Sequence, residues 1–163
     1  MKFERSSGIL LHITSLPGKY GIGTFGAEAH DFVDFLIASR QKVWQILPLG
    51  HTGYGDSPYQ CYSAFAGNPM LIDCELLMKN GLLKETELDV KHTFSDSVVE
   101  YDQVHAFKMP LLLKAADRFL SRASLAEQTK FELFCDQNKY WLDDYATFIA
   151  IKQKNQGKPW WEW

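Results

Sequence analysis

The 163-residue chain has few cysteines, no long hydrophobic run and no excess of basic residues. Its three cysteines are an odd number and form no CxxC pair, so neither a disulfide framework nor a zinc site is expected. A reducing cytoplasm fits this cysteine usage best. No stretch approaches the roughly 18 consecutive apolar residues of a membrane span, and the run Gly8–Ile13 is too short for a signal-peptide core. We therefore expect a cytoplasmic protein without a targeting segment.

Charge is also close to balanced. The formal net charge is −3 and the sequence pI is about 5.9, whereas nucleic acids and anionic membranes need clustered Lys and Arg. We expect neither as a partner. With 46% hydrophobic and 14% aromatic residues, the chain is instead typical of a globular protein with a sizeable core.

The first elements of the chain predict an α/β fold. Gly8–Ile13 is short and almost continuously apolar, as a strand buried on both faces would be. Ala27–Ser39 has a broad apolar helical face, and Lys42–Pro48 reads as a second buried strand. The order strand, helix, strand predicts the crossover unit of a parallel sheet.

The rest of the chain is expected to be mainly helical. Met70–Ile72 is only a brief strand candidate, and Gln103–Phe119 reads as a helix in which Pro110 marks a kink or a start. A capping-box pattern at Ser124 opens another helix. Its aromatic stripe is expected to be core and comprises Phe131, Phe134, Trp141, Tyr145, Phe148 and Ile149.

We divide the chain into residues 1–73, with the first β/α units, and residues 74–163, a mainly helical subdomain. The last residues, 157–163, hold three tryptophans and no polar tail, which indicates a truncated sequence. The strands would then keep unpaired edges, so we expect a partner segment or the helices after Gln103 to cover them.

The loop of residues 51–69 has the composition of a sugar site. A pyranose has an apolar face that can lie on an aromatic ring, and hydroxyls that need hydrogen-bond donors and acceptors. The loop supplies both kinds of side chain, with Tyr54, Tyr59 and Tyr62 as the rings and Asp56, Ser57, Gln60 and Asn68 as the polar groups.

Three other patterns favour structural roles. Gly21–Gly26 matches G-x-G-x-x-G, but the glycines do not directly follow the strand and no acidic residue closes the second strand, so no nucleotide cofactor is expected. His12 lacks partners at metal-ligand spacing and reads as a hydrogen-bonded residue near the strand end. Asp143 and Asp144 read as the solvated side, or the first turn, of a helix. We expect no metal.

Several segments together resemble a known family. Gly8–Gly18, Trp44–Gly50, Gly53–Gln60 and Ser63–Pro69, with Trp141–Ala146 further on, resemble the N-terminal part of amylomaltases, the 4-α-glucanotransferases of glycoside hydrolase family 77. The resemblance implies the first two strands of a (β/α)₈ TIM barrel with a helical insertion, in an enzyme roughly three times as long. It also implies transfer of α-1,4-glucan segments between maltooligosaccharides by a retaining double displacement, without a cofactor.

By the same resemblance, the catalytic carboxylates lie beyond Trp163, and this chain holds no catalytic residue. Tyr59 would support the glucose next to the cleaved bond, and Tyr54 would be a glucan platform further away. A turn role is favoured for Asp56, and sugar and turn roles both stay open for Ser57, Gln60 and Asn68. Two alternatives remain: a non-catalytic carbohydrate-binding module, and an α/β domain that binds a phosphorylated molecule through its glycine-rich loop.

Overall fold

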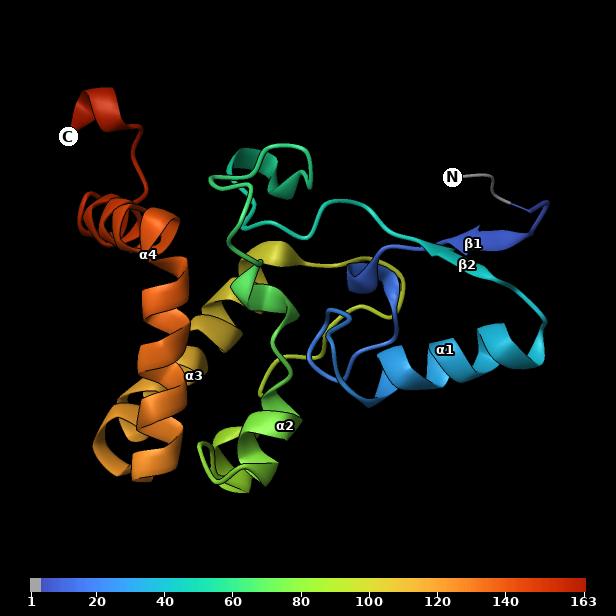
Figure 1. Ribbon diagram of the computed structural model, residues 1–163, viewed down its shortest axis with the longest axis horizontal. Coiled ribbons are helices and arrows are strands. Elements are labelled where there is room, and N and C mark those ends of the chain that lie inside the picture. The colour runs from blue at the N-terminus through green and yellow to red at the C-terminus, as the bar shows by residue number, and fades with distance from the viewer. Residues whose placement is uncertain (1–3) are drawn as a thin grey trace.

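The computed structural model describes residues 4–163, and its first elements form one β/α unit (Figure 1). Strands β1 (Gly8–Leu10) and β2 (Val43–Gln45) pair in parallel, in a register that sets Ile9 opposite Trp44. Helix α1 (Ala27–Ala38) makes the connection between them. The predicted strand, helix, strand order and the parallel pairing are confirmed.

Both strands are shorter than the sequence suggested. β1 ends at Leu10 rather than Ile13, and β2 ends at Gln45 rather than Pro48. The Leu11 amide still donates to the Gln45 carbonyl at 3.0 Å, but Ile13–Ser15 then turns into a 3₁₀ helix, η1. With a single neighbouring strand, backbone beyond this point finds its hydrogen bonds locally.

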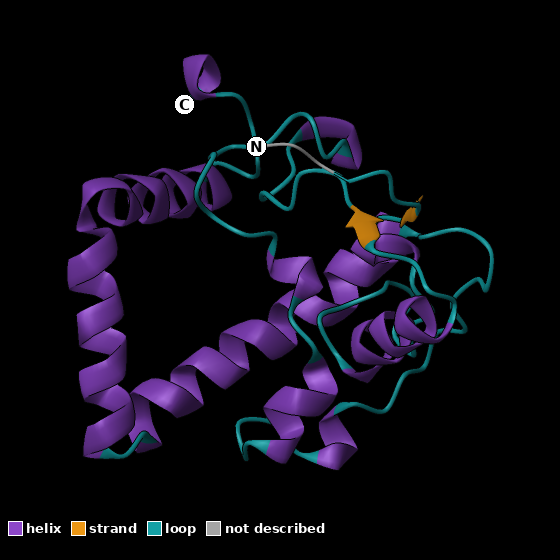
Figure 2. Ribbon diagram, turned by 45° about the vertical axis from the view of Figure 1, so that its right-hand side comes forward, coloured by secondary structure: helices purple, strands orange, loops and turns teal. Residues whose placement is uncertain are grey.

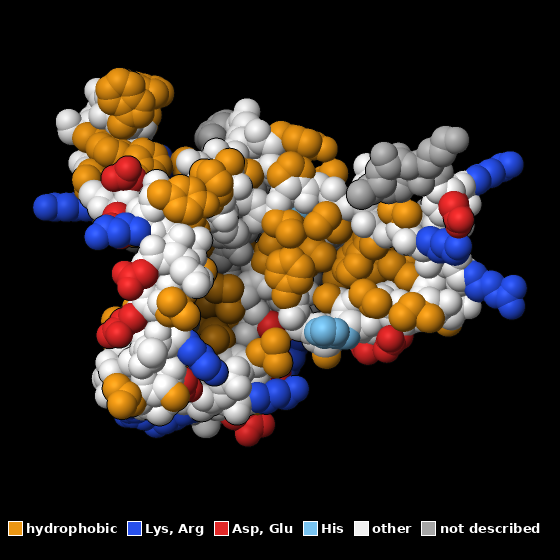
Figure 3. All heavy atoms as spheres, in the orientation of Figure 1, with side chains coloured by type: hydrophobic (Ala, Val, Ile, Leu, Met, Phe, Trp, Pro, Cys, Tyr) orange, Lys and Arg blue, Asp and Glu red, His pale blue; other side chains and the backbone are white. Residues whose placement is uncertain are grey.

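The expectation that the strands are buried on both faces is wrong for this chain. Leu10 is 58% exposed and Val43 is 48% exposed, and Ile37 on α1 is 67% exposed. Hydrophobic side chains accordingly gather on the surface over the strands and α1 (Figure 3). The expected cover from a partner segment or from the later helices is not found within residues 4–163. An exposed apolar surface of this kind is typical of interaction surfaces.

The centre of the molecule is a core around residues 69–71. This segment is a 3₁₀ helix, η3 (Pro69–Leu71), and not the short strand considered from the sequence. Asn68 explains the difference, because its side chain caps the Met70 amide at 3.0 Å while Pro69 occupies the first helical position. Met70 is fully buried and packs with Ile22 and Val104.

Three longer helices follow. They are α2 (Cys74–Lys79), α3 (Tyr101–Arg122) and α4 (Leu125–Lys154). α3 begins before the predicted Gln103 and continues through Pro110, so this proline does not start the helix. The capping box at Ser124 is confirmed, since its hydroxyl and Glu127 bond each other's backbone amides. α3 and α4 meet at a corner, and α4 itself bends sharply along its length (Figure 2).

The aromatic stripe of α4 is not a buried core. None of the α4 side chains that the structure describes is fully buried, and Phe131, Phe134 and Tyr140 are 45%, 48% and 72% exposed. Trp141, Tyr145 and Phe148 contact the 51–69 loop, and Phe131 packs edge-on against Phe119 of α3. Asp143 and Asp144 are exposed on the helix, as the solvated-face interpretation predicts.

Candidate functional site

The candidate site is the loop of residues 51–69, which follows the carboxyl end of β2. It lies between the strands and α4 (Figure 1). Antiparallel bridges join Gly50 to Gly67 and Thr52 to Cys61, so the two arms of the loop form a closed stem. The carboxyl ends of parallel strands are where α/β enzymes place their binding loops.

Tyr59 stands at the tip of this loop. The turn below it is closed by hydrogen bonds from the Gly53 amide to the Gln60 carbonyl, 2.7 Å, and from the Gln60 amide to the Ser57 carbonyl, 3.0 Å. Tyr59 is 72% exposed, so a rigid turn offers a free aromatic face to solvent. The Tyr54 side chain lies outside the described part of the structure, although its backbone begins the 3₁₀ turn η2 (Tyr54–Asp56).

Asp56 is held by other side chains. Its Oδ1 accepts a hydrogen bond from the Thr52 hydroxyl at 3.3 Å and lies 3.5 Å from Nε2 of His105 on α3. The partners that hold this carboxylate are side chains and not backbone amides of its own turn. The turn role itself fits, since Asp56 has a left-handed φ of 51°.

The other polar candidates differ in how accessible their side chains are to a ligand. Asn68 is only 7% exposed, its Oδ1 caps the Met70 amide, and its Nδ2 donates to the Thr52 hydroxyl at 3.5 Å. The Ser57 hydroxyl accepts weakly from the Tyr59 amide at 3.4 Å, and Gln60 is exposed. Ser57 and Gln60 can therefore reach a ligand, whereas Asn68 is committed to shaping the loop.

Contacts with α4 fix the outer side of the loop, and no pattern in the sequence predicts them. His51 Nδ1 and the Tyr145 hydroxyl are 2.6 Å apart, and the His51 ring packs edge-on against Tyr62. Phe65 stacks on Trp141 with ring centroids 5.9 Å apart. In both contacts between the loop and α4, the two residues are more than 70 positions apart in the chain, and no spacing rule connects them.

We expect His51 to make this contact sensitive to acid. Burial, and secondarily the positive charge of His105, lower the pKa of His51 below its ordinary 6.5. The folded protein thus binds this proton less readily than the unfolded chain, so stability present above pH 6.5 is lost as the pH falls below it. His51→Gln should reduce the fall in melting temperature across this range. His30→Gln, an exposed site on α1, is the control; an equal effect of both variants would contradict the prediction.

A small cavity lies beneath the loop, lined by residues that include His12, Asp56, Asn68 and Tyr101. Its volume of about 20 Å³ has room for about one water molecule. His12 Nδ1 is buried without a hydrogen-bond partner, so the expected hydrogen-bonded histidine is not observed at this atom, and burial lowers its pKa. Among residues 4–163, no cluster of His, Cys, Asp and Glu could hold a metal ion.

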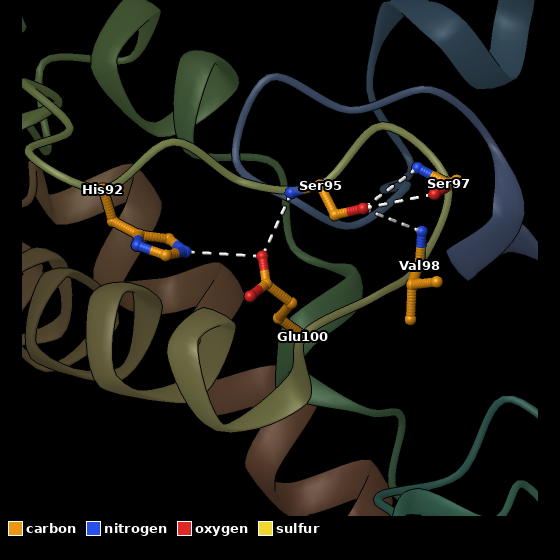
Figure 4. A network of polar contacts seen from close by, with 5 residues as sticks. All are labelled: His92, Ser95, Ser97, Val98 and Glu100. Atoms are coloured by element: carbon orange, nitrogen blue, oxygen red, sulfur yellow. Dashed lines mark hydrogen bonds and ion pairs between the residues drawn. The ribbon is translucent and has the colours of Figure 1, made fainter.

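A larger hollow of about 730 Å³ opens between the glycine-rich loop after β1 and residues 95–99. Its rim is rigid, because Ser95 Oγ accepts from the Ser97 and Val98 amides and Glu100 accepts from the Ser95 amide at 3.0 Å (Figure 4). His92 also contacts Glu100. The carboxylates Glu28 and Asp96 line the hollow with one cation, Lys19, which is already paired with Glu75, so the charge of the lining disfavours a phosphate.

The glycine-rich loop uses its amides within the protein. The Gly21 amide donates to the Gly18 carbonyl, and the Gly23 amide donates to the Thr14 carbonyl, both at 3.2 Å. A dinucleotide loop keeps such amides free for a pyrophosphate. This geometry argues against the phosphate-binding alternative and agrees with the rejection of a nucleotide fingerprint.

Comparison with known proteins assigns the loop to a family. The family model described as 4-alpha-glucanotransferase, glycoside hydrolase family 77, matches residues 11–163. The chain belongs to this family. The match begins just after β1 and includes β2, the complete 51–69 loop and the helices that contact it.

Individual relatives agree with the family. A 4-alpha-glucanotransferase of Streptococcus pneumoniae is 48% identical over 161 residues, and one of Thermus thermophilus is 45% identical over 163 residues. The solved amylomaltase of Streptococcus agalactiae, in complex with acarbose, is 44% identical with a TM-score of 0.90 over 98% of this chain. The chain spans about a third of these proteins: 31%, 32% and 32% of their lengths, respectively.

No helix that the structure describes in residues 4–163 is long and apolar enough to cross a membrane.

Proposed function

We propose that this chain is part of a 4-α-glucanotransferase, which transfers α-1,4-glucan segments between maltooligosaccharides by a retaining double displacement. The observation that carries the proposal is the family match across residues 11–163. Relatives at 45–48% identity bear the name 4-alpha-glucanotransferase, and the matching amylomaltase structure contains acarbose.

The 51–69 loop is the part of the glucan site that this chain contributes. Tyr59 offers an exposed ring for the apolar face of a glucose, and Ser57 and Gln60 offer groups for its hydroxyls. Tyr54 is proposed as a further platform. Asp56 and Asn68, which the sequence also suggested as sugar ligands, act mainly by shaping the loop, since protein partners hold their side chains.

The bond-breaking carboxylates belong to other parts of the enzyme. A retaining mechanism needs a nucleophile and an acid/base carboxyl group about 5 Å apart. Asp56 is the one carboxylate in the 51–69 loop, and it is paired with Thr52 and His105. The loop therefore binds and orients a glucan, and no residue of this chain is proposed as nucleophile or acid/base.

We further infer that β1 and β2 are the first two strands of a (β/α)₈ barrel, with residues 74–163 as a mainly helical insertion. The apolar side chains left exposed on β1, β2 and α1 support this, because later barrel units would cover them. The cytoplasmic location inferred from the cysteines stays a prediction.

A maltotriose assay tests the proposed function. The full-length protein should convert maltotriose into glucose and longer maltooligosaccharides, whereas residues 1–163 alone should form neither, because stacking and hydroxyl contacts cannot supply the covalent intermediate. Products are separated by chromatography against a no-protein control. Transfer by residues 1–163 alone would show that the catalytic carboxylates lie within this chain and that their proposed location is wrong. Glucan binding without transfer by the full-length protein would instead favour the carbohydrate-binding module.

A further inference from the structure

Lys108 is a fully buried lysine that the sugar chemistry described above does not use. It lies on α3 with 0% exposure. Its ammonium group donates hydrogen bonds to the carbonyls of Met70, at 2.6 Å, and Ile72, at 2.7 Å. Both acceptors follow directly from the end of the 51–69 loop, so Lys108 attaches that end of the loop to α3.

A chain of hydrogen bonds continues from this attachment into the loop. The Met70 amide bonds Oδ1 of Asn68 at 3.0 Å, and Nδ2 of Asn68 donates to the Thr52 hydroxyl at 3.5 Å. Thr52 in turn donates to Asp56 at 3.3 Å. The two arms of the loop are thereby linked through side chains as well as through the stem.

This series of polar contacts returns to α3 at His105. Its Nε2 lies 3.5 Å from Oδ1 of Asp56, and it precedes Lys108 by three residues, which places both on one side of the helix. α3 therefore holds the loop at two points, one beside the sugar-binding turn and one beyond the stem.

The cost of burying a charge indicates that Lys108 positions the backbone more than it stabilises the fold. Removing an ammonium group from water is costly unless it is well bonded, and burial lowers the pKa of Lys108 although the charge of Asp73 opposes the change. Apolar residues of similar volume often replace buried charges without loss of stability. A retained buried cation with two short, directional bonds fixes the position of the backbone that it contacts.

We propose that Lys108 is a positioning residue, which holds the 51–72 segment against α3 so that Tyr59 and Ser57 face the glucan. The inference rests on the proposed transferase function. Lys108 touches no substrate and acts through the loop.

The test compares Lys108→Met with Leu111→Ala in the full-length protein. Met keeps the length of the side chain and removes the ammonium group. Leu111, one turn further along α3, is buried in the cluster shared with α2, and its truncation lowers stability without touching the loop. Well below both melting temperatures, Lys108→Met should lower kcat/KM for maltotriose by about tenfold or more, mainly through KM, and Leu111→Ala by less than about twofold.

Hydrogen exchange provides a readout that does not depend on activity. The amides of His51, Tyr62 and Asn68, which close the loop stem, should exchange faster in Lys108→Met and unchanged in Leu111→Ala. If the two variants match in both kinetics and exchange, Lys108 is merely structural and the proposal fails. A wild-type protein without transferase activity overturns the proposed function, while the exchange data still decide the positioning role.

A second variant covers the case in which Lys108→Met does not fold. His105→Leu removes the contact with Asp56 at a partly exposed site and should leave the melting temperature nearly unchanged. We expect a smaller fall in kcat/KM, about threefold, with faster exchange at the Gly53 amide. Unchanged kinetics and exchange in this variant would contradict the proposal.

Discussion

Tyr59→Ala in the full-length protein should reduce kcat/KM for maltotriose about a hundredfold and leave the melting temperature almost unchanged. The ring is 72% exposed at the tip of the loop, so its removal deletes little packing from the folded chain. Its proposed role is to stack on the sugar, where an aromatic contact contributes about 0.5–1.5 kcal/mol beyond area burial and also aligns the glucose for reaction.

Two control variants separate stacking from general surface effects. Tyr59→Phe keeps the ring and should retain most of the activity. Phe134→Ala removes a 48% exposed ring from α4 instead of the loop tip and should cost far less. Normal activity together with a lowered melting temperature in Tyr59→Ala would return this residue to a structural role.

Gly23→Ala should lower the free energy of unfolding by about 3 kcal/mol. A Cβ at this position would lie 2.0 Å from the Ile13 carbonyl oxygen and 2.8 Å from Cβ of Leu16. The Ile13 carbonyl cannot easily move aside, because it already accepts a hydrogen bond from the Leu16 amide at 3.1 Å and its residue is 2% exposed. Denaturant unfolding of the full-length protein measures the change.

Gly67→Ala is the matched control. A Cβ at Gly67 meets no atom within 4 Å, and the residue does not have a left-handed φ. This substitution should change stability by no more than about 0.5 kcal/mol. Equal losses of unfolding free energy at the two glycines would show that the close approach of Gly23 to the Ile13 carbonyl does not affect stability.

Sequence patterns correctly predicted the elements whose signals lie within a few adjacent residues. The apolar period of residues 27–38 fixes α1, and the Ser124–Glu127 capping box fixes the start of α4, because caps and periodicity act within a few residues. The predicted ends of both strands, and the predicted strand at residues 70–72, were wrong. In these segments the available hydrogen-bond partners decide the secondary structure. A strand lengthens only beside a partner strand, and the Asn68 cap favours a 3₁₀ helix at Pro69–Leu71.

The candidate site shows the same division. Loop composition and the family resemblance single out residues 51–69 and Tyr59 as the proposed sugar-binding segment, since aromatic and hydroxyl residues are readable from one stretch of chain. His105 and Lys108, which hold that segment, could not be found in this way. They lie more than 35 residues from their partners, and a lysine within a helix reads as a solvated side chain until packing shows it to be buried.

The sequence by itself determined the family and the parallel β/α unit, because both are encoded by residues adjacent in the chain or at fixed short spacing. Only the tertiary structure decided which polar groups of the loop remain free for a ligand. In the sequence, sugar and turn roles are both open for Asn68, Ser57 and Gln60, but the fold buries Asn68 against the Met70 amide and leaves Gln60 exposed. A side chain's availability depends on which distant segments pack around it, and only the folded chain sets those neighbours.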